Sequence, residues 1–194
     1  MLEQDKADFL NYVRQKVEKI FNDFPVPGHG MDHINRVVEW AIEIAKQENC
    51  DVFYAELAAF LHDIGHVAEH QNNPAQLKHH ELSYILAKEW FEQDREFDVL
   101  TQEEKDMILY AIRNHWDDTA EKYELANVLR DADKLDMYGD IGVQRAVDYY
   151  KTPQAISNNI KQNLLAVNRV KTKTAKRIIE QRNLLKPLKD YLLK

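Results

Sequence analysis

The spacing of apolar residues constrains the fold of this chain more than any other feature of its sequence. Over most of the length, apolar side chains recur at intervals of three and four residues, and the apolar/polar alternation typical of strands is scarce. Glycine and proline, which interrupt helices, number only five each in 194 residues. With 44% hydrophobic residues, the chain is long enough for one compact domain with a sizeable core. The sequence therefore predicts an all-α fold.

We expect helices that are separated by short segments of helix-breaking or capping residues. The sequence FPVPGHG separates the first two predicted helices, and QNNP separates the third and fourth. Thr101 and Glu104 have the spacing of a capping box, in which each side chain accepts a hydrogen bond from the other residue's amide. The predicted helices span 5–23, 31–48, 52–64, 76–93, 102–116, 124–137, 140–151, 154–167 and 172–193.

Charge and composition argue against several classes of protein. The net charge of -7 gives no reason to expect specific nucleic-acid binding or attachment to an anionic membrane, because both depend on clustered lysine and arginine. No apolar run approaches the roughly 18 residues of a membrane span. The N-terminal sequence MLEQDKADFLNYV lacks the features of a signal peptide, and Cys50 is the only cysteine. We therefore expect a cytoplasmic location.

The histidines are concentrated in one part of the chain, because all eight lie between His29 and His115. His33, His62 and His115 each share a helical stripe with apolar residues, so their imidazoles should face inward. Asp133 lies on a similar stripe, where an unpaired carboxylate is costly to bury. A single metal cluster would satisfy all these groups together. The other histidines have a simpler interpretation, as exposed residues of loops or helices: His29, His66, His70 and one of His79 and His80.

His62 and Asp63 are neighbours, and neighbours on a helix point about 100° apart. They can serve one metal only at a helix end, where the ion can lie close to the helix axis. Gly65 follows at once and would let the chain turn away from such a site. The segment LHDIGH is therefore a candidate metal-binding turn.

Three segments, GHGMDHINRVV, LHDIGH and LRDADKLD, resemble in order and spacing the blocks of the HD-domain superfamily of metal-dependent phosphohydrolases. The resemblance implies a single HD domain over residues 1–194, with its helical-bundle core at about 26–150 and a helical C-terminal extension at 151–194. In that superfamily a histidine, an adjacent His-Asp pair and a distant aspartate bind one divalent cation. The matching residues here are His33, His62, Asp63 and Asp133.

Two further segments, HHELS and AIRNHW, resemble the additional histidine blocks of binuclear HD proteins, which include HD-GYP phosphodiesterases and di-iron oxygenases. The spacing of that block relative to Ser83 implies His79, although apolar periodicity alone does not distinguish His79 from His80. His115 fits the later block. Trp116 replaces the second histidine of the HD-GYP proteins and no Gly-Tyr-Pro follows, which disfavours cyclic-dinucleotide hydrolysis.

The additional histidines leave two interpretations open. In the first, His79 and His115 hold a second metal and Asp63 bridges the pair at a separation of roughly 3.5 to 4 Å. That second site should be the weaker one, because it would have two neutral imidazoles and a shared carboxylate. In the second interpretation, the two histidines line the pocket and bind substrate.

The expected chemistry follows from a divalent cation, which polarises a phosphoryl oxygen and acidifies a bound water. We predict a metal-dependent phosphohydrolase that acts on a nucleotide or another small phosphate ester, with Mn, Mg, Fe, Co or Ni as the cofactor. Besides Asp63, the candidate catalytic residues are His66 and Asp136, either of which could transfer a proton. Candidate phosphate-binding cations are Arg36, Arg113, Lys134 and Arg145, for which ordinary surface roles are the alternative.

Other functions are compatible with the same residues. Six-ligand HD sites with His79 and His115 can hold two irons and activate oxygen, so a di-iron oxygenase is the alternative enzyme. A non-catalytic, metal-stabilised sensor module is a third interpretation. The C-terminal helices carry lysine and arginine between apolar positions, which favours a solvated face of a packed helix or a homodimer interface.

Overall fold

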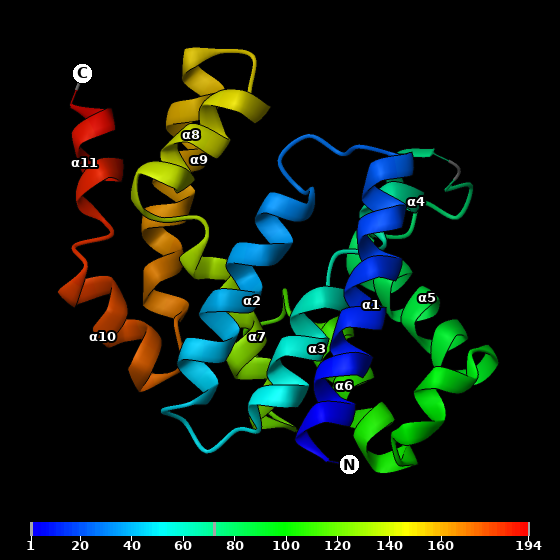
Figure 1. The fold of residues 1–194 in the computed structure, drawn as a ribbon. Helices are drawn as coiled ribbons and strands as arrows, with labels where there is room; N and C mark the ends of the chain where they lie inside the picture. Colours follow the sequence, from blue (N-terminus) through cyan, green and yellow to red (C-terminus); the bar gives the residue numbers. More distant parts are fainter. Residues whose placement is uncertain (1, 72, 194) are drawn as a thin grey trace.

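The computed structural model describes residues 2–71 and 73–193, and within these ranges it contains helices and connecting segments but no strand (Figure 1). The all-α prediction is confirmed. The α-helices are, in order, α1 (Glu3–Asp23), α2 (Met31–Ala45), α3 (Val52–Leu61), α4 (His66–Gln71), α5 (His79–Gln93), α6 (Gln102–Asn114), α7 (Glu124–Leu135), α8 (Gly139–Tyr149), α9 (Pro153–Ala166), α10 (Lys173–Gln181) and α11 (Lys186–Leu192). Two 3-10 helices, η1 (Arg95–Val99) and η2 (Val167–Arg169), follow α5 and α9.

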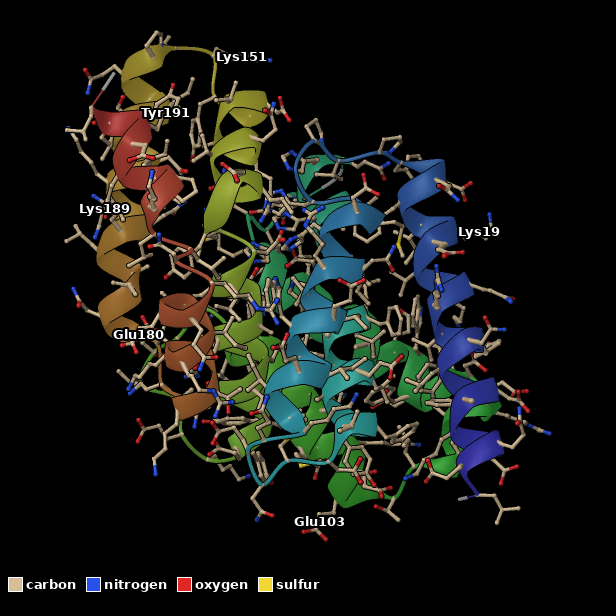
Figure 2. All side chains as sticks on the ribbon, turned by 60° about the vertical axis from the view of Figure 1, so that its left-hand side comes forward. Lys19, Glu103, Lys151, Glu180, Lys189 and Tyr191 are labelled. Carbon is tan, nitrogen blue, oxygen red and sulfur yellow. The ribbon has the colours of Figure 1, made fainter. Side chains whose placement is uncertain are left out.

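The centre of the fold is formed by α2, α3 and α7. Helix α2 packs against both α3 and α7, and α3 also contacts α1 and α6. Figure 1 shows α1, α5 and α6 on one side of this centre and α8 to α11 on the other. Apolar side chains such as Ile34, Leu57 and Leu129 are fully buried here. In contrast, Figure 2 shows the charged side chains of Lys19 and Lys189 on the outside of the bundle.

Helix ends follow local capping chemistry. Thr101 and Glu104 form the predicted capping box at the start of α6. Asp51 caps α3 by accepting a hydrogen bond from the amide of Phe53. Thr152 caps α9, whose first residue is a proline. These caps satisfy amides that have no partner within their own helix.

The predicted helix at 172–193 is wrong in one respect, because the structure divides it into α10 and α11. Asn183 adopts a φ of 50°, a left-handed conformation that asparagine tolerates better than most residues. The chain turns there, and the carbonyl of Leu184 accepts a 2.8 Å hydrogen bond from the amide of Gly139. Pro187 lies in the first turn of α11. The turn thus attaches the C-terminal segment to the start of α8.

A buried aspartate attaches the start of α10 to the bundle. Asp131 on α7 is fully buried, and its Oδ2 accepts hydrogen bonds from the amides of Lys171 at 2.9 Å and Thr172 at 2.6 Å. Burial is the main reason why the pKa of Asp131 is raised.

None of the helices in the described part of the chain combines the length and apolar character that a membrane span requires.

Candidate metal centre

Side chains from five parts of the fold meet between α2, α3, α5, α6 and α7. His33 lies in the first turn of α2, and His62 and His115 are the C-cap residues of α3 and α6. Asp63 follows His62 in the turn before α4, and His79 is the first residue of α5. Together with Asp133 of α7, these residues are called the His–Asp cluster below: His33, His62, Asp63, His79, His115 and Asp133.

Asp63 divides its two carboxylate oxygens between two sets of imidazoles. Its Oδ2 lies 3.3 Å from Nε2 of His33 and 3.4 Å from Nε2 of His62. Its Oδ1 lies 3.8 Å from Nε2 of His79 and 3.8 Å from Nε2 of His115. The side chain is only 4% exposed. Each oxygen is thus directed to a separate group of possible metal ligands.

The two groups are compact. Donor atoms of His33, His62 and Asp133 lie within 4.8 Å of one another, and donor atoms of Asp63, His79 and His115 form a second set within the same limit. The structure brings together all six side chains for which we predicted a metal-binding role.

His79, and not its neighbour His80, joins the cluster. The Nε2 atoms of His79 and His115 are 3.3 Å apart. His80 instead stacks on Trp116, with ring centroids 5.0 Å apart. The side chain of Trp116 is on the surface, with 59% of the residue exposed.

Backbone carbonyls orient two of the imidazoles in the same way. Nδ1 of His62 lies 2.7 Å from the carbonyl oxygen of Ala59, and Nδ1 of His115 lies 2.7 Å from that of Ile112. A carbonyl oxygen only accepts hydrogen bonds, so each Nδ1 donates and each Nε2 faces the cluster. The carbonyls in the last turn of a helix lack partners within the helix, and each imidazole satisfies one carbonyl at the end of its own helix.

The third oriented imidazole depends on a carboxylate. Asp136 accepts hydrogen bonds from Nδ1 of His33 at 2.7 Å, from Nε of Arg36 at 2.5 Å and from Arg145 at 2.7 Å. Burial by itself raises the pKa of Asp136, but the hydrogen bonds from His33 and Arg36 hold that pKa below its usual range. We predicted Asp136 as a proton-transfer residue; the structure instead places it behind His33, where it orients the ring.

This arrangement also changes the interpretation of two predicted phosphate-binding residues. Arg36 and Arg145 direct their guanidinium groups to Asp136, and Arg145 also donates to the carbonyl of Gly28 at 2.8 Å. Each therefore has an internal partner for part of its charge. Nε of Arg145 is buried and has no hydrogen-bond partner among the described residues.

The other two predicted cations point elsewhere. The ammonium of Lys134 is paired with Asp118, although Lys134 is adjacent in sequence to the cluster residue Asp133. Arg113 is half exposed and donates to Glu81 at 2.8 Å. Both cations thus have an internal partner, and their role in binding phosphate stays a prediction, because sequence proximity alone does not determine the direction of a long side chain.

His66 is buried, which is contrary to the simpler interpretation of an exposed residue. Its ring stacks on His79, with centroids 4.0 Å apart, and its Nε2 lies 3.5 Å from Oδ2 of Asp63. On the other side, the ring of His29 lies 4.1 Å from that of His66. Burial is the main cause that lowers the pKa of His66 to about 2, so the imidazole is neutral near pH 7 and a weak proton acceptor. Glu69 contacts its Nδ1 at 3.3 Å.

Sequence reasoning missed His29 and Glu69 as neighbours of the cluster. His29 belongs to a loop, and Glu69 to the short helix α4, which our predicted ranges did not include. The signal that could have found His29 is its place in the segment GHGMDH, four residues before His33.

Gly65 allows α5 to reach the cluster. A Cβ atom at Gly65 would lie 2.3 Å from the carbonyl oxygen of His79 and 2.3 Å from the amide nitrogen of Ser83. The amide of Gly65 donates to Oγ of the buried Ser83 at 2.9 Å. We expected this glycine to let the chain turn away; its main role here is the close backbone contact that positions His79.

The donor set fits a divalent metal ion. Nε2 of His33 and Nε2 of His62 are buried without a hydrogen-bond partner among the described residues, which is costly for polar atoms. Burial by itself lowers the pKa of His62, but Asp63 beside it raises that pKa to about 9. Asp63 thus favours a positive charge at this position, and a bound cation would supply one. Imidazole and carboxylate ligands are suited to Mn, Fe, Co, Ni and Zn.

The sequence matches the HD domain family over residues 30–138. The chain belongs to this family. The resemblance predicted from the three sequence blocks is confirmed, and the chain has the all-α fold of an HD domain. HD domains bind divalent metals, in agreement with the His–Asp cluster.

Several relatives extend this similarity beyond the matched segment. Protein L803 of Acanthamoeba polyphaga mimivirus is 32% identical over 156 residues, which cover 76% of this chain and 64% of the viral protein. The chain therefore spans less than two thirds of the length of that relative. The crystal structure of Bacillus subtilis YpgQ in complex with ADP has a TM-score of 0.73 and 23% identity, and the match covers 97% of this chain and 94% of YpgQ.

A third similar structure also comes from the HD superfamily. The crystal structure of a predicted HD superfamily hydrolase from an uncultured Thermotogales bacterium is 27% identical, with a TM-score of 0.59. The match covers 91% of this chain and 92% of that protein. The chain is thus similar in fold and sequence to other proteins of the HD superfamily.

Proposed function

We propose that this protein is a divalent-metal-dependent phosphohydrolase that acts on nucleotides. The proposal rests on how the two carboxylate oxygens of Asp63 are placed. One oxygen is directed to His33 and His62, and the other to His79 and His115. A carboxylate shared in this way is the arrangement expected of a bridging ligand between two cations.

The ligand assignment follows from the two groups of donor atoms. The tighter site would consist of His33, His62, Asp63 and Asp133, in which two carboxylates offset the charge of the ion. The second site would have His79, His115 and the other oxygen of Asp63. With a single shared carboxylate, the second site should bind its ion more weakly.

When bound, such a cation polarises the phosphoryl oxygen and supplies a water of lowered pKa for attack at phosphorus. The protein's own residues hold the geometry. Asp136 and the carbonyls of Ala59 and Ile112 keep Nδ1 of their histidine partners protonated, so that Nε2 remains directed into the site. His66, whose Nε2 lies 3.5 Å from Oδ2 of Asp63, is the candidate for proton transfer, although burial lowers its pKa in the metal-free protein and disfavours the protonated ring.

Exposure indicates where the phosphate approaches. Most of the cluster is closed to solvent, but the side chains of His79 and Asp133 are 26% and 28% exposed. These residues come from different donor groups, so each proposed site has one ligand that solvent reaches. A phosphate that contacts both cations, as two-metal hydrolysis requires, would approach at these two side chains.

A structurally similar protein supports a nucleotide as the substrate, in preference to other phosphate esters. YpgQ was crystallised in complex with ADP, and its fold matches 97% of this chain. The protein has a net charge of -7 and would on the whole repel a small anionic substrate. Bound divalent cations would give the site itself a positive charge that attracts the phosphates.

The decisive experiment compares Asp63→Ala with the wild-type protein. Phosphate and pyrophosphate release would be measured for nucleoside mono-, di- and triphosphates with Mn, Mg, Co and Fe, alongside metal content. We expect Asp63→Ala to lose bound metal and hydrolysis, because it removes a ligand from both sites. Asp98→Ala, at an exposed aspartate of η1, is the matched control and should retain both. Metal-dependent hydrolysis at the wild-type rate in Asp63→Ala would exclude the proposal.

The six-donor set also favours one alternative, an oxygenase with two irons. Protein that purifies with iron, changes absorbance when exposed to oxygen and releases no phosphate would favour the oxygenase. Recovery of a bound ligand unchanged with every metal would instead favour a sensor module.

A further inference from the structure

A pocket of 220 Å³ adjoins the His–Asp cluster between the loop at Gly28 and helices α8 and α9. His29 forms a wall that the pocket shares with the cluster, since its ring lies 5.7 Å from that of His33 and 4.1 Å from that of His66. A ligand in the pocket would therefore be separated from the cluster residue His33 by the ring of His29. Arg145 lines the same pocket.

The size of the pocket limits what it can hold. Sites for drug-sized ligands usually enclose roughly 300 to 1,000 Å³, so a pocket of 220 Å³ is suited to a single ring system. A nucleotide has such a ring system at one end and its phosphates at the other. With the phosphates at the proposed ions, the base would lie in this pocket.

The polar groups of the pocket form a short hydrogen-bond chain with free ends. Asn163 donates from Nδ2 to Oδ1 of Asn159 at 3.2 Å, and Asn159 donates from Nδ2 to the hydroxyl of Tyr150 at 3.2 Å. In the described part of the chain, Oδ1 of Asn163 accepts no hydrogen bond and the hydroxyl of Tyr150 donates none. The pocket thus offers an acceptor and a donor at its inner wall, and Asn163 is only 7% exposed.

Aromatic rings complete the pocket. Tyr149 contacts Tyr150 edge to face, with centroids 5.0 Å apart, and its ring lies 6.1 Å from that of His29. Aromatic faces bind nucleobases of any kind by stacking, whereas hydrogen-bonding groups distinguish one base from another. The pocket therefore combines a surface for stacking with groups that can read the edge of a base.

We propose that this pocket binds the base of the substrate nucleotide and that Asn163, Asn159 and Tyr150 determine base preference. The inference rests on the proposed function, because phosphates bound at the His–Asp cluster place the base nearby. A competing position is the exposed ring of Trp116, which follows His115 in the turn after α6 and offers stacking without enclosure.

The test compares substrates with and without a base. Values of kcat/KM would be measured with Mn for ATP, GTP, CTP and UTP, and for inorganic tripolyphosphate, which has no base. Asn163→Leu removes the amide with little change in side-chain volume, and Ala146→Leu fills the pocket. Asn158→Leu, at an exposed asparagine of the same helix, is the matched control, and Trp116→Ala tests the competing position.

We expect Asn163→Leu and Ala146→Leu to lose about tenfold or more in kcat/KM for the preferred nucleotide, with a change below about twofold for tripolyphosphate. Asn158→Leu and Trp116→Ala should behave like wild type with every substrate. Wild-type kcat/KM for nucleotides in both pocket variants would refute the pocket assignment but leave the proposed function intact. Loss in Trp116→Ala alone would move the base to that residue.

A separate measurement covers the case in which wild-type protein hydrolyses none of these compounds, which would refute the proposed function. Saturation-transfer NMR would then test binding of adenosine, guanosine, cytidine and uridine to the metal-free protein. Binding to wild type that is lost in Ala146→Leu would support the pocket as a base site without hydrolysis. No binding, or equal binding to both proteins, would refute it. Far-UV circular dichroism of each variant controls for folding.

Discussion

Asp136 and His33 are 103 residues apart in the sequence, yet Oδ2 of the first lies 2.7 Å from Nδ1 of the second. The carboxylate fixes the orientation of the imidazole and holds its proton on Nδ1. It also joins α7 to α2, because Arg36 of α2 donates to the same side chain. Ligand orientation and helix packing thus depend on one aspartate.

Replacement of Asp136 should therefore weaken metal binding without removing a ligand. We expect Asp136→Asn to lower the metal affinity of the tighter site by about 10- to 100-fold, the effect usual for partners that orient a ligand. Isothermal titration with Mn measures it. Asp131→Asn is the control, because Asp131 bonds the amides of Lys171 and Thr172 instead. That variant should lose about 1–3 kcal/mol of unfolding free energy at unchanged metal affinity. Unchanged metal affinity in Asp136→Asn, together with a loss of affinity in Asp131→Asn, would contradict the role of Asp136 in orienting His33.

Gly65→Ala should disturb the second donor group. The added methyl would meet backbone atoms of His79 and Ser83 at 2.3 Å, and backbone cannot move aside like a flexible side chain. We expect a loss of about 1–3 kcal/mol in stability and reduced occupancy of the second metal site. Urea unfolding and metal analysis test these two results. Gly30→Ala, where a Cβ would meet nothing within 4 Å, should leave the occupancy of the second metal site unchanged and cost less stability, through the N-cap of α2 alone.

The number of bound metals depends on His115. We expect His115→Ala to lose one equivalent of metal and to retain the tighter one, because His115 belongs only to the group that contains His79 and Asp63. Titration of metal-depleted protein with Mn, followed by elemental analysis, gives the stoichiometry. Two equivalents in saturated His115→Ala would show that this imidazole lines the pocket without coordinating.

Acid stability should depend on Asp94, far from the His–Asp cluster. Burial by itself raises the pKa of Asp94, but hydrogen bonds from Lys16 and Tyr12 of α1 lower it below its usual range. An acid with a lowered pKa stabilises the fold above its unfolded-state pKa, near 3.9, and this stabilisation is lost as the pH falls through the folded-state pKa. Asp94→Asn should therefore cost about 1–2 kcal/mol at pH 7 and less at pH 2.5. Urea unfolding at both pH values measures the difference; an equal cost at both would contradict this role of the charge.

Periodicity predicted most of the fold because each helix has an apolar face and the breaks contain residues that stop helices. It failed near Asn183, where LLKPLKDYLL continues a helical pattern through a turn. The turn forms because Gly139, distant in sequence, supplies an amide for the carbonyl of Leu184. A tertiary hydrogen bond of this kind leaves no local signal in the sequence.

In the candidate site too, features that depend on local spacing were predicted and features that depend on tertiary contacts were not. His33, His62 and Asp133 were predicted from their positions on apolar stripes, which depend only on local spacing, and the structure places them side by side. The partners of Lys134 and Asp136 could not be predicted in this way. Asp118 lies in the connection between α6 and α7, and Arg145 comes from α8, so each pair forms only when the helices are assembled.

The donors of the His–Asp cluster come from five separate places along 101 residues of chain, from His33 to Asp133. No short segment can hold the ions by itself, so a fully unfolded chain would bind them poorly. If the proposed ions bind, they select the assembled bundle by mass action, with roughly 2.7 kcal/mol gained when free metal is 100 times the dissociation constant. The thermal midpoint would then rise with metal concentration, and the lifetime of the protein in a cell would follow the local supply of that metal.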